Sequence, residues 1–439
     1  MPIRHVPNSD LEYFLLCFDK DGRERPETDG SRLSEEIVQR LRDPAEGITD
    51  VFLMSHGWKG DVPATVDQYD RWSAAMAACE GDRARVRQRW PGFKALLIGF
   101  HWPSQPWGDE KMEGSFDAGA GQDVEAFIAD WGDRIADTDA ARAALRVLFE
   151  EAKNDVEPDR LPSRVVDAYR TLEREAGLGA EDVAGPPDAD REALDPQMAY
   201  EDWQEMSETS FDGGILGGLL SPLRQLSFYT MKKRARRVGE LGGYDLLQKI
   251  LDRPGAKVRL HLMGHSFGCI VVSSMLRGTD ARGGRASSAL LVQGAMSLWS
   301  MAKELPDHPD KPGYFRAIID TKSVAGPIVV TTSKFDRVVG SIYPLAARGA
   351  RQVDYDATAL PKYGAIGTFG LQGSGLTLEQ RDIARDITHA YGFKPGCVYN
   401  LKSDDVIRTG GGLSGAHSDI AHPEVGHAFW EAVLATPDT

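Results

Sequence analysis

The chain has 439 residues and a formal net charge of −15, and 41% of its residues are hydrophobic and 27% are charged. This is the ordinary composition of a globular protein, which excludes wholesale disorder and a fibrous architecture. Because the chain is acidic overall, nucleic acids and anionic membrane surfaces are poor candidates for partners, and we expect no nucleic-acid binding.

The cysteines and the N-terminus predict the compartment in which the protein works. The four cysteines are far apart and fit neither a disulfide framework nor the paired spacing of a zinc site. Residues 1–10 lack the apolar segment of a signal peptide, and no run approaches the roughly 18 apolar residues of a membrane span. These features predict a cytoplasmic protein without a transmembrane segment, and they carry no signal for its oligomeric state.

The N-terminal part of the chain predicts strands that end in turn residues. Residues 11–18 favour an edge strand, and residues 31–41 favour a helix that begins after a Ser cap. The apolar runs at 48–54 and 93–100 are short and bounded by turn residues, as buried parallel strands are. The first of these two runs leads directly into His56-Gly57-Trp58.

An acidic segment follows, because residues 101–220 contain 29 Asp and Glu against 10 Lys and Arg. Three helical patterns lie in it, joined by Pro- and Asp-rich links, at residues 124–135, 140–153 and 163–176. We interpret 106–220 as an acidic helical cap inserted into one α/β core, which is formed by 1–105 and 221–439. Acidic runs are usually solvated surface, so the charge by itself predicts no charge-specific role.

The C-terminal part of the chain alternates strands and helices after a long helical pattern at about 221–252. The expected strands are 257–263, 289–293, 327–332 and 397–401, and the expected helices are 267–277 and 423–434. This alternation predicts a mostly parallel central sheet flanked by helices. The basic run at 232–237 favours a solvated helix face paired with the acidic insertion, and docking of an anionic substrate or partner is the alternative.

The sequence Gly264-His265-Ser266-Phe267-Gly268 is a G-x-S-x-G motif between an expected strand and an expected helix. This setting is typical of a nucleophile elbow, in which the glycines let backbone segments approach closely around an exposed Ser. The helix N-terminus then directs its N–H groups and the positive end of its dipole toward the site. An ordinary turn capped by Ser266 is the alternative, and the flanking elements favour Ser266 as a nucleophile.

A serine hydroxyl needs a general base, and the base needs an acid that orients it. Asp336 follows the strand expected at 327–332, so its carboxylate can reach over the carboxyl edge of the sheet. Its neighbours Lys334 and Arg337 are expected to help keep it ionised. Two later carboxylates are the alternatives, Asp404 and Asp405.

Three histidines near the C-terminus are candidate bases: His417, His422 and His427. His417 lies in an expected loop between the last strand and the last helix, where an imidazole can reach a nucleophile. His422 precedes the helix and His427 lies within it, so we assign the base to His417. Metal binding by this cluster is an alternative, but the chain has no H-E-x-x-H motif and a metal would leave the Ser motif unexplained, so we expect no metal.

Backbone N–H groups are the candidates for an oxyanion hole, which needs two donors aimed at developing negative charge. One is the N–H of Phe267, which directly follows the proposed nucleophile. The second is the N–H of Trp58 or of Gly57, because both follow the strand expected at 48–54.

Aromatic and glycine-rich segments are the candidates for a substrate pocket. We expect substrate contacts from Trp102, His265 and Leu216, and Leu216 lies in a stretch of Gly and Leu that also suits a lid hinge. The glycine-rich loop 364–375 is expected to line the site. It does not join a strand to a helix in a G-x-G-x-x-G pattern, so we expect no nucleotide there.

With these motifs the chain resembles the α/β-hydrolase superfamily and, more closely, a group of microbial serine-esterase-like proteins. The matching features are His56-Gly57-Trp58, Trp102-Pro103-Ser104, Arg234-Ala235-Arg236-Arg237-Val238-Gly239, the G-x-S-x-G motif, Asp336 and Gly415-Ala416-His417-Ser418-Asp419. The resemblance covers about residues 45–105 and 220–436, and it leaves the acidic segment 106–215 unmatched.

The resemblance implies an α/β-hydrolase fold and a serine hydrolase that cleaves carboxylic esters through an acyl-enzyme intermediate. In that mechanism Ser266 attacks, His417 moves the proton and Asp336 holds the imidazole. No metal or organic cofactor is implied, and the expected substrate is a small-molecule or lipid-like ester. The alternatives are a catalytically silent binding or scaffold protein, and an acyltransferase or a peptidase that uses the same triad.

Overall fold

The computed structural model describes residues 3–7, 9, 11–58, 62–104, 124–179, 184–207, 218–252, 258–278, 285–306, 308–341, 360–410 and 415–438. The chain divides into two compact units. The first combines Met1–Ser104 with Arg234–Thr439, and the second is Gln105–Lys233. In this described part of the chain, no helix has the length and apolar character that a membrane crossing requires.

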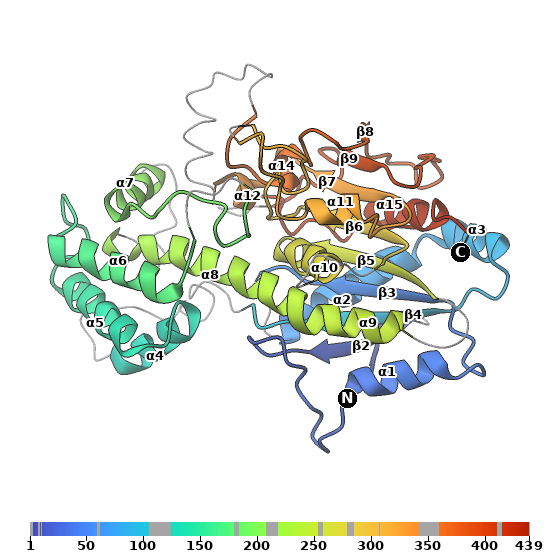
Figure 1. Ribbon diagram of the computed structural model, residues 1–439, viewed down its shortest axis with the longest axis horizontal. Helices are drawn as coiled ribbons and strands as arrows, with labels where there is room; N and C mark the ends of the chain where they lie inside the picture. The colour runs from blue at the N-terminus through green and yellow to red at the C-terminus, as the bar shows by residue number, and fades with distance from the viewer. Residues whose placement is uncertain are drawn as a thin grey trace. The chain divides into compact units, whose positions relative to one another are not determined.

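The first unit is an α/β structure built on one mostly parallel sheet (Figure 1). Its described strands follow the order β1-β2-β4-β3-β5-β6-β7-β9-β8. Their bounds are β1 Ile3–His5, β2 Glu12–Cys17, β3 Asp50–Ser55, β4 Ala95–His101, β5 Arg259–His265, β6 Ser288–Val292, β7 Ile328–Thr332, β8 Leu378–Asp382 and β9 Val398–Lys402. The β1–β2 pair is antiparallel and the other neighbouring pairs are parallel, so the expected mostly parallel sheet is confirmed.

Helices cover both faces of this sheet (Figure 1). On one face α15 packs against α2 and α3, whose bounds are Pro423–Leu434, Val62–Ala77 and Glu80–Arg89. On the other face α10 contacts α9 and α11, and α9 contacts α1. These helices are α1 Leu33–Arg42, α9 Tyr244–Leu251, α10 Phe267–Arg277 and α11 Arg316–Asp320. Two short helices, α12 Arg337–Ser341 and α14 Ile366–Phe369, lie near the end of β7.

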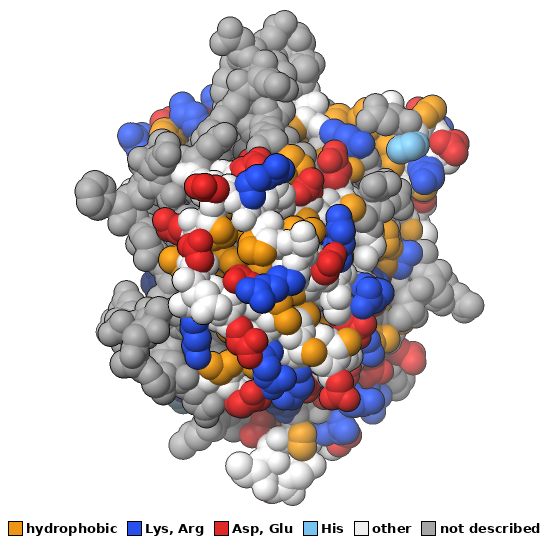
Figure 2. Space-filling model, turned by 90° about the vertical axis from the view of Figure 1, so that its left-hand side faces the viewer, with side chains coloured by type: hydrophobic (Ala, Val, Ile, Leu, Met, Phe, Trp, Pro, Cys, Tyr) orange, Lys and Arg blue, Asp and Glu red, His pale blue; other side chains and the backbone are white. Residues whose placement is uncertain are grey.

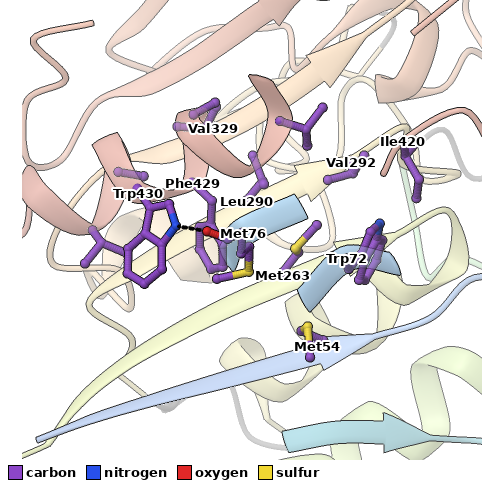
Figure 3. Packing of buried hydrophobic residues seen from close by; sticks show 14 of the residues in the cluster. Met54, Trp72, Met76, Met263, Leu290, Val292, Val329, Ile420, Phe429 and Trp430 are labelled. Atoms are coloured by element: carbon purple, nitrogen blue, oxygen red, sulfur yellow. Dashed lines mark hydrogen bonds between the residues drawn. The ribbon is translucent and has the colours of Figure 1, made fainter. Parts of the chain in front are cut away.

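A buried apolar cluster holds α2, α3 and α15 against the sheet (Figure 3). Met54 on β3 and Met263 on β5 point into it, toward Trp72 of α2 and Trp430 of α15. The indole N–H of Trp430 donates to the carbonyl of Met76 at 3.0 Å. Because parallel strands are buried on both faces, their sequences read as continuous apolar runs, which is why most of them could be predicted.

The sheet differs from the sequence expectation at its edges. β2 was expected at an edge, but β1 pairs with it, so that prediction is wrong. β1 has three residues, too few for a readable pattern, and the edge strand β8 has the largely polar sequence LEQRD. Edge strands have one solvated side and therefore need no continuous apolar run.

The long helical pattern at 221–252 forms three consecutive pieces, α8 (Pro222–Val238), a π-helical turn (Gly239–Gly243) and α9. The glycines of this turn let it pack closely on α10. A Cβ on Gly239 would lie 2.5 Å from the Val271 carbonyl oxygen, and a Cβ on Gly243 would lie 2.5 Å from the Met275 side chain. The π-helical turn is thus the place where this part of the chain packs closely on α10, a contact that the sequence pattern alone does not indicate.

The second unit is helical and has its own apolar core. Its helices are α4 Val124–Arg134, α5 Asp139–Asn154, α6 Ser163–Ala176 and α7 Pro196–Ser207, followed by the first part of α8. Trp131, Leu145 and Tyr169 are fully buried in this core. Three of the predicted helices therefore fall in one body, whose boundary at residue 233 lies within α8 rather than at 220.

Some acidic side chains of the second unit pair with basic ones, although acidic residues outnumber basic ones in this part of the chain. On the face drawn in Figure 2, red and blue side chains are interspersed among apolar ones. Pairs such as Arg142 with Asp137 and Arg146 with Glu125 lie within this unit, both at 2.6 Å. Exposed pairs of this kind contribute about 0–1 kcal/mol each, so they make the surface compatible with water more than they stabilise it.

The basic run at 232–237 is not the solvated helix face expected from the sequence. Lys232 is fully buried in the second unit, with its ammonium over the rings of Phe228 and Tyr229. Burial lowers the pKa of Lys232 to about 8, and the nearby Asp190 and Asp188 carboxylates oppose this shift. The expected attraction between the basic run and the acidic segment is therefore found between Lys232 and the Asp188 and Asp190 carboxylates, in the buried interior of the second unit.

The other side chains of this run bind backbone and carboxylate groups. Lys233 Nζ donates to the carbonyls of Ala176 and Gly177, both at 2.8 Å, at the C-terminus of α6, where the helix dipole favours a cation. The remaining contacts lie in the first unit: Arg234 with the Pro103 carbonyl, Arg236 with Glu240 and Arg237 with Asp21. The run is therefore part of the packing of both units.

Candidate active site

Ser266 lies in the sharp turn between β5 and α10. Its backbone φ is +55° and its ψ is −120°, a conformation that L-residues rarely adopt. The two glycines of the motif are required by close approach. A Cβ on Gly264 would lie 2.5 Å from the Gly268 carbonyl oxygen, and a Cβ on Gly268 would collide with the Ser55 carbonyl. The turn thus combines a strained Ser with tight backbone packing, the geometry expected of a nucleophile elbow.

Three residues that the sequence singled out lie in one hydrogen-bonded chain. Ser266 Oγ is 2.8 Å from His417 Nε2, and His417 Nδ1 is 2.8 Å from Asp336 Oδ2. Because the Asp336 carboxylate accepts, His417 carries its proton on Nδ1 and presents Nε2 as an acceptor to the Ser266 hydroxyl. All three side chains are buried or nearly so.

Neutral donors, and not the expected cations, hold the Asp336 carboxylate. Its Oδ2 also accepts from Gln293 Nε2 at 3.0 Å, and its Oδ1 accepts from the Val339 N–H at 3.3 Å. Lys334 and Arg337 are exposed whereas Asp336 is buried, and Lys334 pairs with Asp404 at 3.6 Å. The described hydrogen bonds of Asp336 therefore include neither of these two cations.

The alternative acids lie elsewhere. Asp404 pairs with Lys334 and Lys402, and Asp405 pairs with Arg385. Their described contacts are to surface cations, and none of them is to His417.

The loop that carries His417 is fixed from several sides. The Ala416 N–H donates to the Phe335 carbonyl at 2.9 Å, which joins this loop to the segment that carries Asp336. Asp419 Oδ2 accepts from the N–H groups of Arg408 at 3.0 Å and Thr409 at 2.7 Å. Burial alone would raise the pKa of Asp419, but these two donors and His422 outweigh it and lower the pKa.

His265 supports this loop instead of facing a substrate. Its Nε2–H donates to the His417 carbonyl at 2.9 Å, and its Nδ1 accepts from Gln68 Nε2 at 3.2 Å. Its ring packs edge-on against Trp72 on the α2 side of the sheet. Burial holds the pKa of His265 well below its ordinary value, so the ring is neutral. The predicted substrate contact of His265 is replaced by a contact to the backbone of His417.

The backbone around Gly57 lies directly against the proposed nucleophile. A Cβ on Gly57 would lie 2.7 Å from the Ser266 Cβ. His56 Nδ1–H donates to the Gly57 carbonyl at 2.7 Å. In a trans peptide the C=O and the following N–H point in opposite directions, so this bond turns the Trp58 N–H away from His56. The Trp58 ring stacks on Phe267 at 5.4 Å, which brings together the two segments predicted to supply oxyanion donors.

Trp102 packs beneath the His56 loop. It is fully buried, its ring stacks on His56 at 5.6 Å, and its Nε1–H donates to the His56 carbonyl at 3.1 Å. Its backbone N–H donates to His56 Nε2 at 3.3 Å, and burial holds the pKa of His56 well below its ordinary value. Trp102 thus stabilises a neutral His56 and does not line an open surface, contrary to the predicted substrate contact.

The structure describes only one of the two glycine-rich segments predicted to contribute to a substrate pocket in full. Leu216 lies outside the described residues, and the following Leu219 and Leu220 are fully buried in the core of the second unit. The loop 364–375 packs along β7, where the Ser333 N–H donates to the Gly367 carbonyl at 2.9 Å. The described contacts of Gly367 in this loop are to Ser333 and Gln293, which both lie beside Asp336 in the fold.

The other two candidate bases form separate pairs. His422 Nε2 is 2.8 Å from Asp419 Oδ1. His427 is fully buried and donates from Nδ1 to Asp82 at 2.6 Å and from Nε2 to the His389 carbonyl at 2.7 Å. Within the described residues, no group of three or more His, Cys, Asp or Glu side chains is arranged to hold a metal ion.

Folding stability should depend on the charge of His427. Burial alone would lower the pKa of His427, but Asp82 and the His389 carbonyl both accept from the ring and together raise the pKa. The protonated ring therefore stabilises the folded state fully below its unfolded pKa of about 6.5, and this contribution is lost as pH rises through the higher folded pKa. We expect His427→Gln to lower the free energy of unfolding by about 3–5 kcal/mol near pH 5.5 and by less near pH 9. Urea unfolding at both pH values tests this, and an equal loss at both would contradict it.

The sequence reasoning missed three residues that support the site: His56, Gln68 and Gln293. For His56 and Gln293 the available signal was their position, because each directly follows an apolar strand, as the residues at the carboxyl edge of a parallel sheet do. Gln68 lies inside α2 and carries no comparable signal.

Comparison with known proteins gives no match, since no family model, curated protein or solved structure matches this chain. Function must therefore be inferred from the chemistry of the residues. A Ser, a His and an Asp joined in this order can pass a proton from the hydroxyl to the imidazole while the carboxylate stabilises the resulting positive charge.

Proposed function

We propose that the protein is a serine hydrolase that cleaves carboxylic esters through an acyl-enzyme intermediate. The observation that carries this proposal is the continuous chain Ser266–His417–Asp336, with its Ser on a strained strand-to-helix turn. A buried, strained Ser bonded to an oriented imidazole has no role in packing alone, which makes a silent scaffold the weaker alternative.

The strand order supports the finer assignment to the α/β-hydrolase fold. The proposed nucleophile follows β5 and the proposed acid follows β7, while the His follows β9, the last strand in the chain. The proposed oxyanion loop follows β3. This is the chain order Ser, Asp, His, with an early loop beside the elbow, that α/β-hydrolases use.

The reaction proceeds in two halves. Ser266 Oγ attacks the carbonyl carbon of the ester while its proton passes to His417 Nε2. The bond to the alcohol oxygen then breaks, and His417 protonates the departing alcohol. In the second half His417 takes a proton from water, the hydroxide attacks the acyl carbon, and the carboxylic acid leaves as Ser266 regains its proton.

Negative charge develops on the carbonyl oxygen in both halves. The N–H of Phe267 at the start of α10 and the N–H of Trp58 are the proposed donors to it. Each such donor typically contributes about a hundred- to thousandfold in rate. His56 acts here as a positioning residue, because it orients the Gly57–Trp58 peptide.

Labelling by a fluorophosphonate probe tests the proposal, with wild type beside Ser266→Ala. We expect wild type to label and Ser266→Ala not to label, because phosphonylation requires a serine activated by a base. Ser374→Ala, a change at an exposed serine of the 364–375 loop, is the control and should label as wild type does.

A series of p-nitrophenyl esters of increasing chain length then sizes the acyl site. We expect turnover of at least the short esters by wild type, with the chain-length optimum reporting the acyl pocket. Folded wild type that neither labels nor turns over any ester would refute the hydrolase and favour the scaffold.

A further inference from the structure

Gln293 is a buried polar residue in an unusual backbone conformation. It directly follows β6, is fully buried, and has a φ of +44°, in the left-handed region that glutamine rarely adopts. A buried amide without partners costs free energy, and such a φ adds strain, so both are retained only where surrounding contacts compensate. The contacts of its side chain therefore indicate its role.

Every hydrogen-bonding group of this side chain has a defined partner. Oε1 accepts from the Thr331 hydroxyl at 3.0 Å, and the Thr331 oxygen in turn accepts from the Gln293 backbone N–H at 3.1 Å. Nε2 donates to the Gly367 carbonyl at 3.1 Å and to Asp336 Oδ2 at 3.0 Å. Thr331 on β7 and Gly367 on α14 thus hold the amide in one orientation, in which an N–H points at Asp336.

Asp336 Oδ2 is the same oxygen that accepts from His417 Nδ1. We propose that Gln293 is a positioning residue that fixes the Asp336 carboxylate so that Oδ2 faces His417. This inference rests on the proposed serine hydrolase function and adds a fourth side chain to its site. Gln293 acts through Asp336 and touches neither Ser266 nor His417 in any described contact.

The close packing of Gly367 supports the same assignment. A Cβ on Gly367 would lie 2.8 Å from the carbonyl carbon of Gln293, so a side chain there would displace the carbonyl that accepts from Nε2. The glycine-rich loop 364–375 therefore has a structural purpose, which is to place an acceptor beside Gln293.

The groups around Asp336 explain why a neutral amide is a suitable hydrogen-bond donor to its carboxylate. His417 and the N–H groups of Gln293 and Val339 face the carboxylate, while Lys334 is paired with Asp404. Each neutral donor stabilises the carboxylate without adding a charge that would repel the imidazolium formed during the reaction.

The test compares Gln293→Met with a matched control, Asn400→Leu. Both changes remove a buried side-chain amide at nearly constant size. Asn400 bonds the Leu371 N–H and carbonyl of the same glycine-rich loop, at 2.9 and 2.8 Å, but does not contact Asp336. We expect Gln293→Met to lower kcat about 10- to 100-fold with KM within about twofold of wild type. Asn400→Leu should leave kcat within about threefold.

A readout that does not need turnover separates this inference from the proposed function. The Nδ1 proton of a His bound to a carboxylate gives a far-downfield NMR signal, which His417→Gln would assign by its loss. We expect this signal to broaden or shift in Gln293→Met and to persist in Asn400→Leu. If that selective change occurs in a protein that hydrolyses no ester, the positioning role holds and the hydrolase proposal fails. An unchanged signal in Gln293→Met, or an equal change in both variants, overturns the positioning role.

Gln293→Glu gives a second test that keeps the side-chain shape. Two carboxyl groups about 3 Å apart share one proton, so the protonated Glu can still donate to Asp336 at low pH. We expect activity within about threefold of wild type near pH 6 and a new alkaline loss of at least about tenfold by pH 9. A pH profile parallel to that of wild type would overturn the inference.

Discussion

Replacing His417 with Gln is expected to lower kcat for ester hydrolysis by about 10⁵- to 10⁶-fold, the largest effect of any single change in this site apart from loss of Ser266 itself. The imidazole accepts the Ser266 proton at 2.8 Å and holds the Asp336 carboxylate at 2.8 Å on its other nitrogen. A glutamine side chain can occupy part of this space, but its amide cannot take up a proton near neutral pH. Single-turnover kinetics with a p-nitrophenyl ester measures the loss of acylation directly.

His422→Gln is the matched control, because His422 is the neighbouring candidate base. It contacts Asp419 Oδ1, and the loop keeps its other support through Asp419 Oδ2. We expect a loss of less than about tenfold. A drop of several orders of magnitude in His422→Gln, with activity retained in His417→Gln, would move the base to His422.

Asp336→Asn is expected to lower kcat by about 10⁴-fold without unfolding the protein. Three N–H donors converge on the two carboxylate oxygens, from His417, Gln293 and Val339. The Asn amide has one acceptor oxygen and two N–H donors of its own. At least one of the three surrounding donors must therefore face the amide NH₂ group and lose its hydrogen bond. The neutral amide also cannot stabilise the imidazolium that forms when Ser266 loses its proton.

The measurement is kcat and KM of Asp336→Asn beside Asp404→Asn, with thermal unfolding of both. Asp404 is the alternative acid and pairs with Lys334 and Lys402, so its change should leave kcat within about threefold. Nearly full activity in Asp336→Asn would refute the role of Asp336 as the orienting acid.

Local patterns in the sequence were enough to predict the three main residues of the proposed site. Ser266 was indicated by two glycines between an apolar strand and an apolar helix, and a strand-to-helix turn is built from contiguous residues. Asp336 and His417 were indicated because each follows a buried strand late in the chain. Parallel strands end at one edge of a sheet, so residues after different strands can meet there although 151 positions separate Ser266 from His417.

Side-chain partners from distant segments could not be predicted in this way. His265 and Trp102 have the composition of pocket residues, yet one holds the His417 carbonyl and the other holds His56. Lys232 reads as a surface charge, yet it is buried beside two aromatic rings. In each case the sequence shows the type of group, and the partner that decides its role comes from elsewhere in the chain.

Short-range patterns in the sequence predicted the alternation of strands and helices, the separate acidic helical segment, and the Ser, His and Asp that lie together. These follow from periodicity and from turn residues, which act over a few neighbouring positions. The tertiary structure alone showed how Asp336 is held, that His427 pairs with Asp82 and that Gln293 bonds Asp336. Hydrogen bonds to buried groups depend on distances of about 3 Å between segments that only the packed sheet brings together.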